Sequence, residues 1–303
     1  KMKKKIITKI SEGLGNQLFM YANAYALSKK NDFEFYVDPY SGYFKKKHAY
    51  KYFLNRFNTT SKIASPKYVF ANHFKHIIKK ILVFFDIFRK YKKFIFEKKD
   101  HNKQSKYYPI DLSLTNNIFF LDGNFETEKY FIDFRNDLLA EFKIKDIHTF
   151  SKNKYLSLIE NNNVVSICVR QNRFSERIKN INDKKSILKS KLFVEETVDY
   201  IYKSISYFDN RIKNPLYLVW SNDFIGLEKY FDTRKFIFVE NNDDKVLTDF
   251  YLLTKCKYFI VGPSTFHWWG AWLSTHNDKI CLRPKNINPS KNIDFWPEKW
   301  KAI

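Results

Sequence analysis

The second half of the chain alternates between short apolar runs rich in β-branched residues and segments whose apolar residues have helical spacing. Five runs predict strands, namely VVSICV (164–169), LYLVW (216–220), KFIFV (235–239), YFIVG (258–262) and KICLR (279–283). Helices are expected over 193–207, 249–254 and 265–274, with a short one near Leu227. Strands that alternate with helices predict a parallel sheet with helices on both faces, whose ligands bind beyond the carboxyl ends of the strands.

The first half opens in the same way. Strands are expected over 6–10, 33–37 and 118–121, and helices over 16–30 and 125–142. The polar stretch 143–163, which ends in three Asn, is the best linker candidate. We therefore predict an α/β protein with two Rossmann-like parallel-sheet domains, 1–150 and 151–303, that face each other across a cleft.

The segment 67–106 departs from this pattern. It contains 12 Lys or Arg and 3 Asp or Glu, a balance of 12 minus 3, or +9. From Ile77 to Ile95, apolar residues recur every three or four positions, which predicts a helix with one apolar stripe. We favour a basic helical insertion that packs this stripe on the core, and a helix lying on an anionic membrane surface is the alternative.

Composition narrows the class of protein. With 44% hydrophobic residues among 303, the chain can bury a sizeable core, which excludes global disorder. Lys and Arg number 54 against 32 Asp and Glu, a net charge of +22. Such basicity raises the alternative of a nucleic-acid-binding protein. However, the cations are scattered and the aromatic residues mostly follow core spacing, so we expect no nucleic-acid partner.

The three cysteines, Cys168, Cys256 and Cys281, lie far apart in or beside apolar runs. Buried, reduced thiols are expected, which indicates a cytoplasmic protein. The apolar stretch at the N-terminus is too short for a signal peptide, and no run of about 18 apolar residues predicts a membrane span.

Two of the seven glycines lie in GLGNQLF (13–19), directly after the first predicted strand. A tight glycine turn lets a ligand approach the backbone and opens a helix whose N–H groups can face an anion. The third glycine of a dinucleotide fingerprint is missing, and no Gly-Lys-Ser/Thr follows. Taken alone, this motif indicates a strand-to-helix turn.

A second motif, PSTFHWWGAWL (263–273), follows the strand YFIVG. Ser264 is expected to cap the helix. The N–H groups of Ser264, Thr265 and Phe266, with two hydroxyls, predict an anion pocket at a strand's carboxyl end that suits a diphosphate. We expect most of the three Trp of this helix to lie in the core, and His267 to pack or cap rather than catalyse.

The two motifs, in this order and separation, resemble those of glycosyltransferase family 11, the bacterial α-1,2-fucosyltransferases and their relatives. Residues 249–273 resemble the family's block over its whole length, and Ser221-Asn222-Asp223 resembles its Ser-Asp-Asp. The resemblance runs from about residue 6 to 284 but does not cover about 40–108. It implies a GT-B fold, with an acceptor-side N-terminal domain and a C-terminal domain that binds a GDP-sugar.

The family's central motif is His-x-Arg-Arg-x-Asp, at the end of the first strand of the donor domain. The aligned run here is CVRQNR (168–173), which keeps only the first arginine, Arg170. The resemblance implies that Arg170 pairs with the donor diphosphate and stabilises the departing GDP. Cys168 replaces the His, and its backbone is expected to reach the guanine. Arg173 replaces the Asp and reverses a charge beside the donor.

The resemblance also implies the other donor contacts. Ser264, Thr265 and Phe266 would hold the diphosphate, and Asp223 would accept from the guanine N–H edge. The full set of expected donor-binding residues is Gly13, Gly15, Asn16, Gln17, Cys168, Arg170, Ser221, Asp223, Ser264, Thr265 and Phe266.

Catalysis is expected to need no metal and no cofactor other than the GDP-sugar, because no Asp-x-Asp occurs and protein cations would carry that charge. The family implies inversion, which usually requires a base on the acceptor hydroxyl. Glu176 is the first choice for this base, and Glu12 and His267 are the alternatives. The predicted catalytic residues are therefore Arg170, Asn16 and Glu176.

The resulting hypothesis is an inverting transfer of L-fucose, or a related 6-deoxyhexose, from GDP to a sugar hydroxyl. The expected linkage is α-1,2 to a galactoside, in the synthesis of a bacterial O-antigen, capsule or lipopolysaccharide. Loss of the His and Asp of the central motif leaves another GDP-deoxysugar, such as GDP-colitose, open as the donor. A lipid-linked oligosaccharide acceptor would bring this cytoplasmic enzyme to the inner face of the membrane, where peripheral contact through the basic segment is the alternative to its packing on the core.

Overall fold

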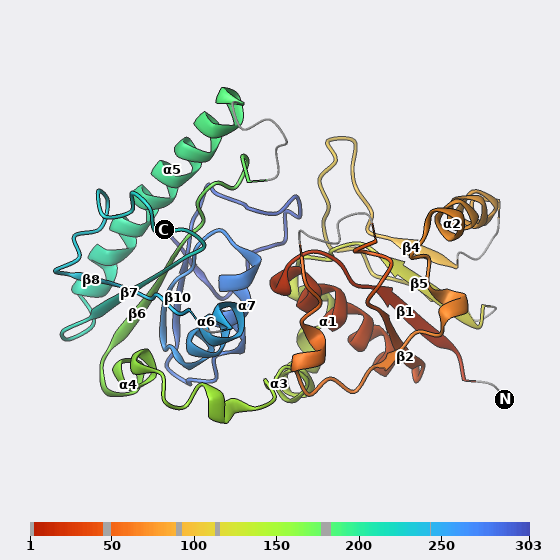
Figure 1. Cartoon of the computed structure of the whole chain (residues 1–303), viewed down its shortest axis with the longest axis horizontal. Coiled ribbons are helices and arrows are strands. Elements are labelled where there is room, and N and C mark those ends of the chain that lie inside the picture. The colour runs from red at the N-terminus through yellow and green to blue at the C-terminus, as the bar shows by residue number, and fades with distance from the viewer. Residues whose placement is uncertain (1–2, 45–49, 89–92, 113–115, 177–182, 243) are drawn as a thin grey trace. The chain divides into compact units, whose positions relative to one another are not determined.

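The structure is a computed structural model that describes residues 3–44, 50–88, 93–112, 116–176, 183–242 and 244–303. The chain divides into two compact units, the first made of 1–145 and 290–297 and the second of 146–289 and 298–303. Each unit is built on its own parallel sheet with helices packed against it (Figure 1). The predicted α/β class with two Rossmann-like parallel-sheet units is confirmed.

The first unit has a five-stranded sheet in the order β3-β2-β1-β5-β4. Its elements are β1 (Lys5–Lys9), α1 (Leu14–Asn31), β2 (Glu34–Asp38), η1 (Leu54–Arg56), β3 (Lys62–Ile63), η2 (Pro66–Tyr68), α2 (His73–Asp86), β4 (Phe94–Phe96), β5 (Ile118–Asp122), η3 (Glu128–Tyr130), η4 (Ile132–Phe134) and α3 (Arg135–Glu141). Strand order reverses between β1 and β5, so the residues that follow β1 lie at a topological switch point, where ligands of such sheets bind.

The second unit has a six-stranded sheet in the order β11-β10-β9-β6-β7-β8. Its elements are η5 (Ile147–Thr149), α4 (Lys154–Asn161), β6 (Val164–Val169), α5 (Lys184–Asp209), β7 (Leu216–Ser221), β8 (Phe236–Phe238), α6 (Lys245–Lys255), β9 (Tyr258–Ile260), α7 (Thr265–Leu273), β10 (Ile280–Arg283) and β11 (Lys301–Ala302). All residues of β6 are buried, as a central strand requires. The switch point of this sheet lies between β6 and β9.

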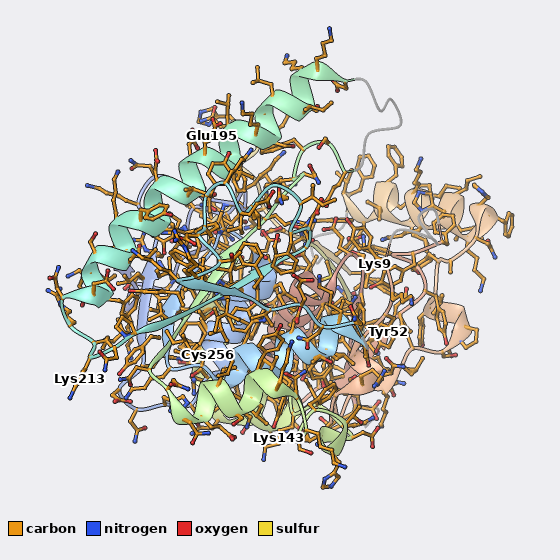
Figure 2. The ribbon with its side chains drawn as sticks, turned by 60° about the vertical axis from the view of Figure 1, so that its left-hand side comes forward. Lys9, Tyr52, Lys143, Glu195, Lys213 and Cys256 are labelled. Carbon is orange, nitrogen blue, oxygen red and sulfur yellow. The ribbon has the colours of Figure 1, made fainter. Side chains whose placement is uncertain are left out.

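The side chains of the second unit explain two compositional features. Cys168, Cys256 and Cys281 are free thiols and buried, as predicted; Figure 2 labels Cys256, which directly follows α6. Trp268, Trp269 and Trp272 of α7 are also buried. The indole of Trp268 packs on that of Trp300, with 5.5 Å between the ring centroids. The tryptophan-rich helix is therefore part of the core. None of the helices within the described ranges is long and apolar enough to cross a bilayer.

The C-terminal segment 290–297 returns to the first unit. Its backbone pairs with Ser105, which donates to Lys291 at 2.9 Å and accepts from Ile293 at 2.8 Å. Asp294 adds an ion pair with Lys129 at 2.9 Å. The expected domains, divided at residue 150, placed 290–297 in the second domain. The sequence did not predict that this segment belongs to the first unit, because its position depends on contacts with residues far away in the chain.

Three expected elements differ in the structure. Residues 222–235 form turns in place of a helix near Leu227, because Gly226 adopts a left-handed backbone with φ 75°. The helix expected over 125–142 is reduced to η3, η4 and α3, following a positive φ at Phe125. The stretch expected as a linker, 143–163, contains α4. That helix belongs to the second unit, where the Tyr155 hydroxyl donates to the Phe238 carbonyl at 3.0 Å.

The helix expected from Ile77 to Ile95 also differs. Helix α2 ends at Asp86, and 94–96 forms strand β4, which pairs with β5. The buried carboxylate of Asp86 accepts from the backbone N–H groups of Lys93 and Phe94 at 2.9 and 3.0 Å. These bonds fix the entry into β4. The favoured interpretation, in which the stripe packs on the core, is wrong for α2, because the stripe residues Ile77, Ile81 and Phe84 are exposed.

Candidate active site

In the second unit, the predicted donor residues follow strands that are neighbours in the sheet. Arg170 follows β6, Asp223 follows β7, and Ser264 comes four residues after β9. Because all these strands are parallel, their carboxyl ends meet at one edge of the sheet. Arg170 and Ser264 come from the two strands that flank the switch point. The structure therefore brings these predicted residues to the edge where α/β sheets bind ligands.

Arg170 forms an ion pair with Glu176, and about a quarter of each side chain is exposed (28% and 25%). The turn between them depends on Asn172, whose backbone is left-handed with φ 55° and whose carbonyl accepts from the N–H of Glu176 at 2.8 Å. Asn tolerates this conformation better than most residues. Glu176, the first choice for the base on the acceptor hydroxyl, is therefore paired with Arg170.

The loops after β6 and β7 are tied together by side-chain amides. Gln171 donates from its backbone to Asn222 Oδ1 at 2.8 Å and from Nε2 to the Asp223 carbonyl at 2.8 Å. Asn172 donates to the Asp223 carboxylate at 3.2 Å, and the N–H of Ile225 donates to the same carboxylate at 3.0 Å. Gln171 and Asn172 were not predicted as functional residues. They stand in the run aligned with the family motif, and they position both loops.

Ser221 has a supporting position. Its hydroxyl donates to the Val169 carbonyl at 3.0 Å and accepts from the N–H of Asp223 at 3.2 Å. Because the side chain is buried and bonded on both sides, Ser221 joins the ends of β6 and β7. Its predicted contact with the donor would have to be indirect.

The N-terminus of α7 forms part of this edge. Ser264 is the N-cap, as predicted, and its Oγ accepts from the N–H of Phe266 at 3.2 Å. The N–H of Ser264 donates to the Gly262 carbonyl at 2.7 Å. Two of the three N–H groups expected to face an anion are therefore engaged within the protein. The half-buried hydroxyls of Ser264 and Thr265 lie at the positive end of the helix dipole.

Arg173, which replaces the family's acid, has structural contacts. One of its terminal nitrogens donates to the Pro289 carbonyl, and its guanidinium lies 5.3 Å from the ring centroid of Phe193. A cation over an aromatic face is stabilised by the ring quadrupole. These contacts fasten the loop after β6 to the chain near Pro289.

His267, one of the alternative bases, is fully buried. Its Nδ1 accepts from the N–H of Gly262 at 2.9 Å, so Nε2 carries the proton of the neutral ring and donates to Ser166 Oγ at 2.6 Å. Burial lowers the pKa of His267 to about 3. The structure therefore excludes His267 as a base in contact with substrate and confirms its packing role.

The end of β9 lies very close to β6. A Cβ on Gly262 would meet the Cys168 carbonyl oxygen at 2.2 Å, so only glycine fits there. Burial raises the pKa of the Cys168 thiol to about 12, which keeps it protonated. The contact expected between the Cys168 backbone and the guanine stays a prediction.

Asp249 on α6 is a buried carboxyl that the predicted site did not include. It accepts from Asn241 Nδ2 at 2.7 Å, and Asn241 Oδ1 in turn accepts from Asn153 at 2.8 Å. Burial raises the pKa of Asp249 to about 6, and its charge raises the pKa of Cys168 on β6. Asp249 is the first residue of the block that resembles the family. An acid among the apolar residues of a helix was the signal in the sequence that could have marked it as a candidate site residue.

In the first unit, Glu12 and Gly13 follow β1 at the switch point. Glu12 has a left-handed backbone with φ 63°, which is rare for a glutamate and costs energy. Its half-buried carboxylate accepts from Asn16 Nδ2 at 2.7 Å, and its carbonyl accepts from the Tyr43 hydroxyl at 3.2 Å. Asn16 therefore orients the Glu12 carboxylate.

Gly13 is the N-cap of α1, with an ordinary φ of −77°. A Cβ there would meet only the Tyr50 ring, at 3.9 Å. Neither backbone conformation nor packing requires glycine at this position. Gly15, in the first turn of the helix, is buried, and the close approach of a ligand to Gly13 and Gly15 stays a prediction.

Gln17 is fully buried and has a structural position. Its Nε2 donates to the carbonyls of Glu12 at 2.8 Å and Lys51 at 2.7 Å, and its Oε1 accepts from the N–H of Phe53 at 2.9 Å. Since both amide hydrogens are used, Gln17 holds Glu12 in its strained backbone. The predicted ligand contact does not fit this arrangement.

In the part of the chain that the structure describes, no group of three or more His, Cys, Asp or Glu is arranged to hold a metal ion. Metal independence of the reaction stays a prediction.

The sequence signature described as "Glycosyl transferase family 11" matches residues 5–301. Two curated relatives come from Escherichia coli. An alpha-1,2-colitosyltransferase is 26% identical over 307 residues, covering 98% of each chain. The O-antigen biosynthesis glycosyltransferase WbnK is 28% identical over 319 residues, covering 95% of this chain and 98% of the relative.

Solved structures share the fold. The fucosyltransferase NodZ from Bradyrhizobium is similar with a TM-score of 0.50 and 12% identity, over 89% of this chain and 93% of NodZ. Arabidopsis thaliana FUT1, in a structure with GDP, is similar with a TM-score of 0.52 and 12% identity, over 94% of this chain and 71% of FUT1. The likeness extends over both sheets and confirms the expected GT-B type of fold.

Proposed function

The chain belongs to glycosyltransferase family 11, and we propose that it transfers a 6-deoxyhexose or related deoxysugar, with L-fucose as the first candidate, from GDP to a sugar hydroxyl with inversion. The observation that carries this proposal is the arrangement of Arg170 and the α7 N-terminus at the switch point of the second sheet. A guanidinium and a helix N-terminus both favour a diphosphate.

In the proposed reaction, the acceptor oxygen forms a bond to the anomeric carbon while the bond from that carbon to the diphosphate breaks. The bonding electrons go to the diphosphate oxygen, where negative charge builds. Arg170 stabilises this charge, with the hydroxyls of Ser264 and Thr265 beside it. The acceptor proton must leave to a base.

We assign this base to Glu12. Of the three acids and bases considered, His267 is buried and neutral, and Glu176 is paired with Arg170. Glu12 is half-buried at the carboxyl edge of β1, and Asn16 and Gln17 hold it in a strained conformation. Backbone strain of this kind occurs preferentially at functional sites.

We assign the guanine edge to Asp249 as an alternative to Asp223. The carboxylate of Asp223 already accepts from Asn172 and Ile225, which favours a role in the loop. The Asp249 carboxyl is buried, which raises its pKa, and a charge-assisted bond to a guanine N–H would offset the cost of its ionisation.

The donor sugar is proposed from relatives. NodZ has been soaked with GDP-fucose and co-crystallised with GDP, which supports a GDP-sugar donor. The E. coli colitosyltransferase matches along nearly its whole length, which supports GDP-colitose as the second donor. We propose an α-1,2 linkage to a galactoside in O-antigen synthesis, on the names of the two E. coli relatives.

The test measures GDP release by the purified protein with GDP-fucose and GDP-colitose, each with and without a β-galactoside acceptor. Acceptor-dependent release from one donor supports the proposal, and mass and NMR analysis of the product gives the linkage and anomeric configuration. The matched control is Arg170→Ala, which should bind acceptor but release little GDP. No release from either donor, with GDP binding absent in calorimetry, would refute the GDP-sugar assignment. Repeating the binding in EDTA tests metal independence.

A further inference from the structure

Helix α2 presents its apolar side chains away from its own unit. Six of them, Phe74, Ile77, Ile81, Phe84, Phe85 and Phe88, are between 50% and 74% exposed, Phe88 lying just beyond the helix end. At about 100° per residue, all six fall on one face. Figure 1 shows α2 beside β4 at the periphery of the first unit. Contiguous exposed apolar surface of this kind marks an interaction site.

The opposite face of α2 is mostly polar and attaches the helix to the sheet. Lys79 pairs with Asp122 of β5 at 2.6 Å, and Asp122 also pairs with Lys9 of β1. The buried Asp86 accepts from the start of β4. Since these polar contacts fix the orientation of the helix, the exposure of its apolar face is built into the fold.

The charges that border the apolar face are positive. Lys80 is exposed along one edge, and Lys75 lies along the other, where its Nζ also donates to the Pro66 carbonyl at 2.8 Å. The single acid of α2, Asp86, is buried toward the sheet. Apolar residues flanked by lysines, with no exposed acid on the helix, match an anionic lipid surface, where lysines can extend to the headgroups.

We propose that α2 docks this enzyme on an anionic membrane surface, with the apolar face in the headgroup boundary. The helix has 14 residues, about 21 Å at 1.5 Å per residue, too short to span a hydrocarbon core of about 30 Å. It therefore lies in the plane of the interface. A second copy of the chain is a poorer occupant, because two chains of charge +22 would bring like-charged lysines together.

Vesicle co-sedimentation tests the proposal. The wild-type protein should bind phosphatidylcholine vesicles that contain about one third phosphatidylglycerol, bind pure phosphatidylcholine weakly, and dissociate in high salt. Ile77→Ser with Phe85→Ser should weaken binding by about tenfold or more. The matched control, Leu188→Ser with Leu192→Ser, removes two exposed apolar side chains from α5 and should bind like the wild type.

Charge reversal has its own control. Lys80→Glu should lower binding by roughly 25-fold, because the change removes a cation that the anionic surface attracts and adds an anion that the surface repels. Lys203→Glu makes the same change in net charge on an exposed position of α5 and should have little effect. If both variants lost binding equally, the effect would come from the net charge of the protein and not from α2, and the proposed docking of α2 would be overturned.

A site-specific probe tests the orientation. The native cysteines are buried, so Ile81→Cys introduces an accessible thiol for a polarity-sensitive dye. Its emission should shift to the blue on anionic vesicles, whereas a dye at Leu188→Cys should not shift. No shift at position 81, or equal shifts at both, would overturn the proposal. The proposal would also be overturned if light scattering showed that the protein is a dimer and that Ile77→Ser with Phe85→Ser dissociates it. In that case a second copy of the chain would cover the apolar face of α2.

Discussion

The guanidinium of Arg170 is paired with the carboxylate of Glu176, six residues further along the chain. The turn between them depends on the left-handed backbone of Asn172. A diphosphate that binds Arg170 must share or replace this partner, so binding exchanges one anion for another. Glu176 is therefore better suited to position Arg170 than to take a proton from the acceptor.

Removing the charge of Glu176 should strengthen the binding of GDP. We expect Glu176→Gln to lower the Kd of GDP by about threefold to tenfold, because a partly exposed ion pair is modest in strength and no longer competes. By contrast, Glu12→Gln should leave GDP binding unchanged and lower kcat by about 100-fold or more, as for loss of a general base. Calorimetry and initial rates separate the two effects. A 100-fold loss of kcat in Glu176→Gln alone would restore Glu176 as the base.

The two arginines of the central run should differ in the kind of defect. Arg170→Ala should lower kcat by about 100- to 1,000-fold, since it removes a cation from the developing phosphate charge. Arg173→Ala should mainly lower the melting temperature, through loss of the bond to Pro289 and the contact with Phe193. Rates below the melting transition and thermal unfolding measure both. Similar mild losses of rate in the two variants would show that the phosphate is held elsewhere.

The parallel sheets could be predicted because their strands are local apolar runs. The helix expected as far as Ile95 shows the limit of that approach. Its apolar spacing continues past Asp86, but the buried Asp86 carboxylate binds the start of β4 and ends the pattern there. The orientation of α2 is also set by a distant residue. Lys79 pairs with Asp122, which lies 43 residues further along the chain, and this contact turns the face that carries Lys79 toward the sheet.

The candidate site could be predicted in part, because its motifs follow strands that are visible as local apolar runs. Motifs placed Arg170, Ser264 and Asp223 after parallel strands, and the fold brings them to one edge. The functions of Gln17 and Ser221 could not be read from the motifs, because each depends on backbone partners far away in the sequence, such as Lys51 and Val169. Asp249 stands among apolar residues of its helix, which was a signal, but the pattern alone does not show that its carboxyl is buried beside Asn241.

The affinity for GDP should depend on pH through Asp249. Burial raises its pKa to about 6, so its carboxyl takes up a proton as the pH falls from 7 to 5 and loses the charge that strengthens its bonds with the guanine N–H groups. We expect weaker GDP binding over that range. Asp249→Asn should weaken binding by about tenfold or more at pH 7.5 and remove the pH dependence, whereas Asp223→Asn should keep it.

The same group gives a stability readout. An acid whose pKa is raised on folding stabilises the protein below its unfolded pKa, and this contribution is lost as the pH rises through about 6. At pH 7.5 Asp249→Asn should therefore raise the melting temperature while it weakens GDP binding. A variant that loses both stability and affinity would place Asp249 in the scaffold and return the guanine edge to Asp223.

His267 should make the second unit sensitive to acid. Burial lowers its pKa to about 3, whereas in the unfolded chain it titrates near 6.5. The folded ring stays neutral, so its contribution to stability is complete above about pH 6.5. It is lost as the pH falls toward 3, by up to about 1.4 kcal/mol per pH unit. His267→Gln should unfold more readily at pH 7.5, since the bonds to Gly262 and Ser166 are disturbed. It should also show a shallower fall in unfolding free energy between pH 6.5 and 4, measured by urea titration. An unchanged slope would mean that His267 already carries its proton in the folded protein, and that the neutral tautomer assigned to it is wrong.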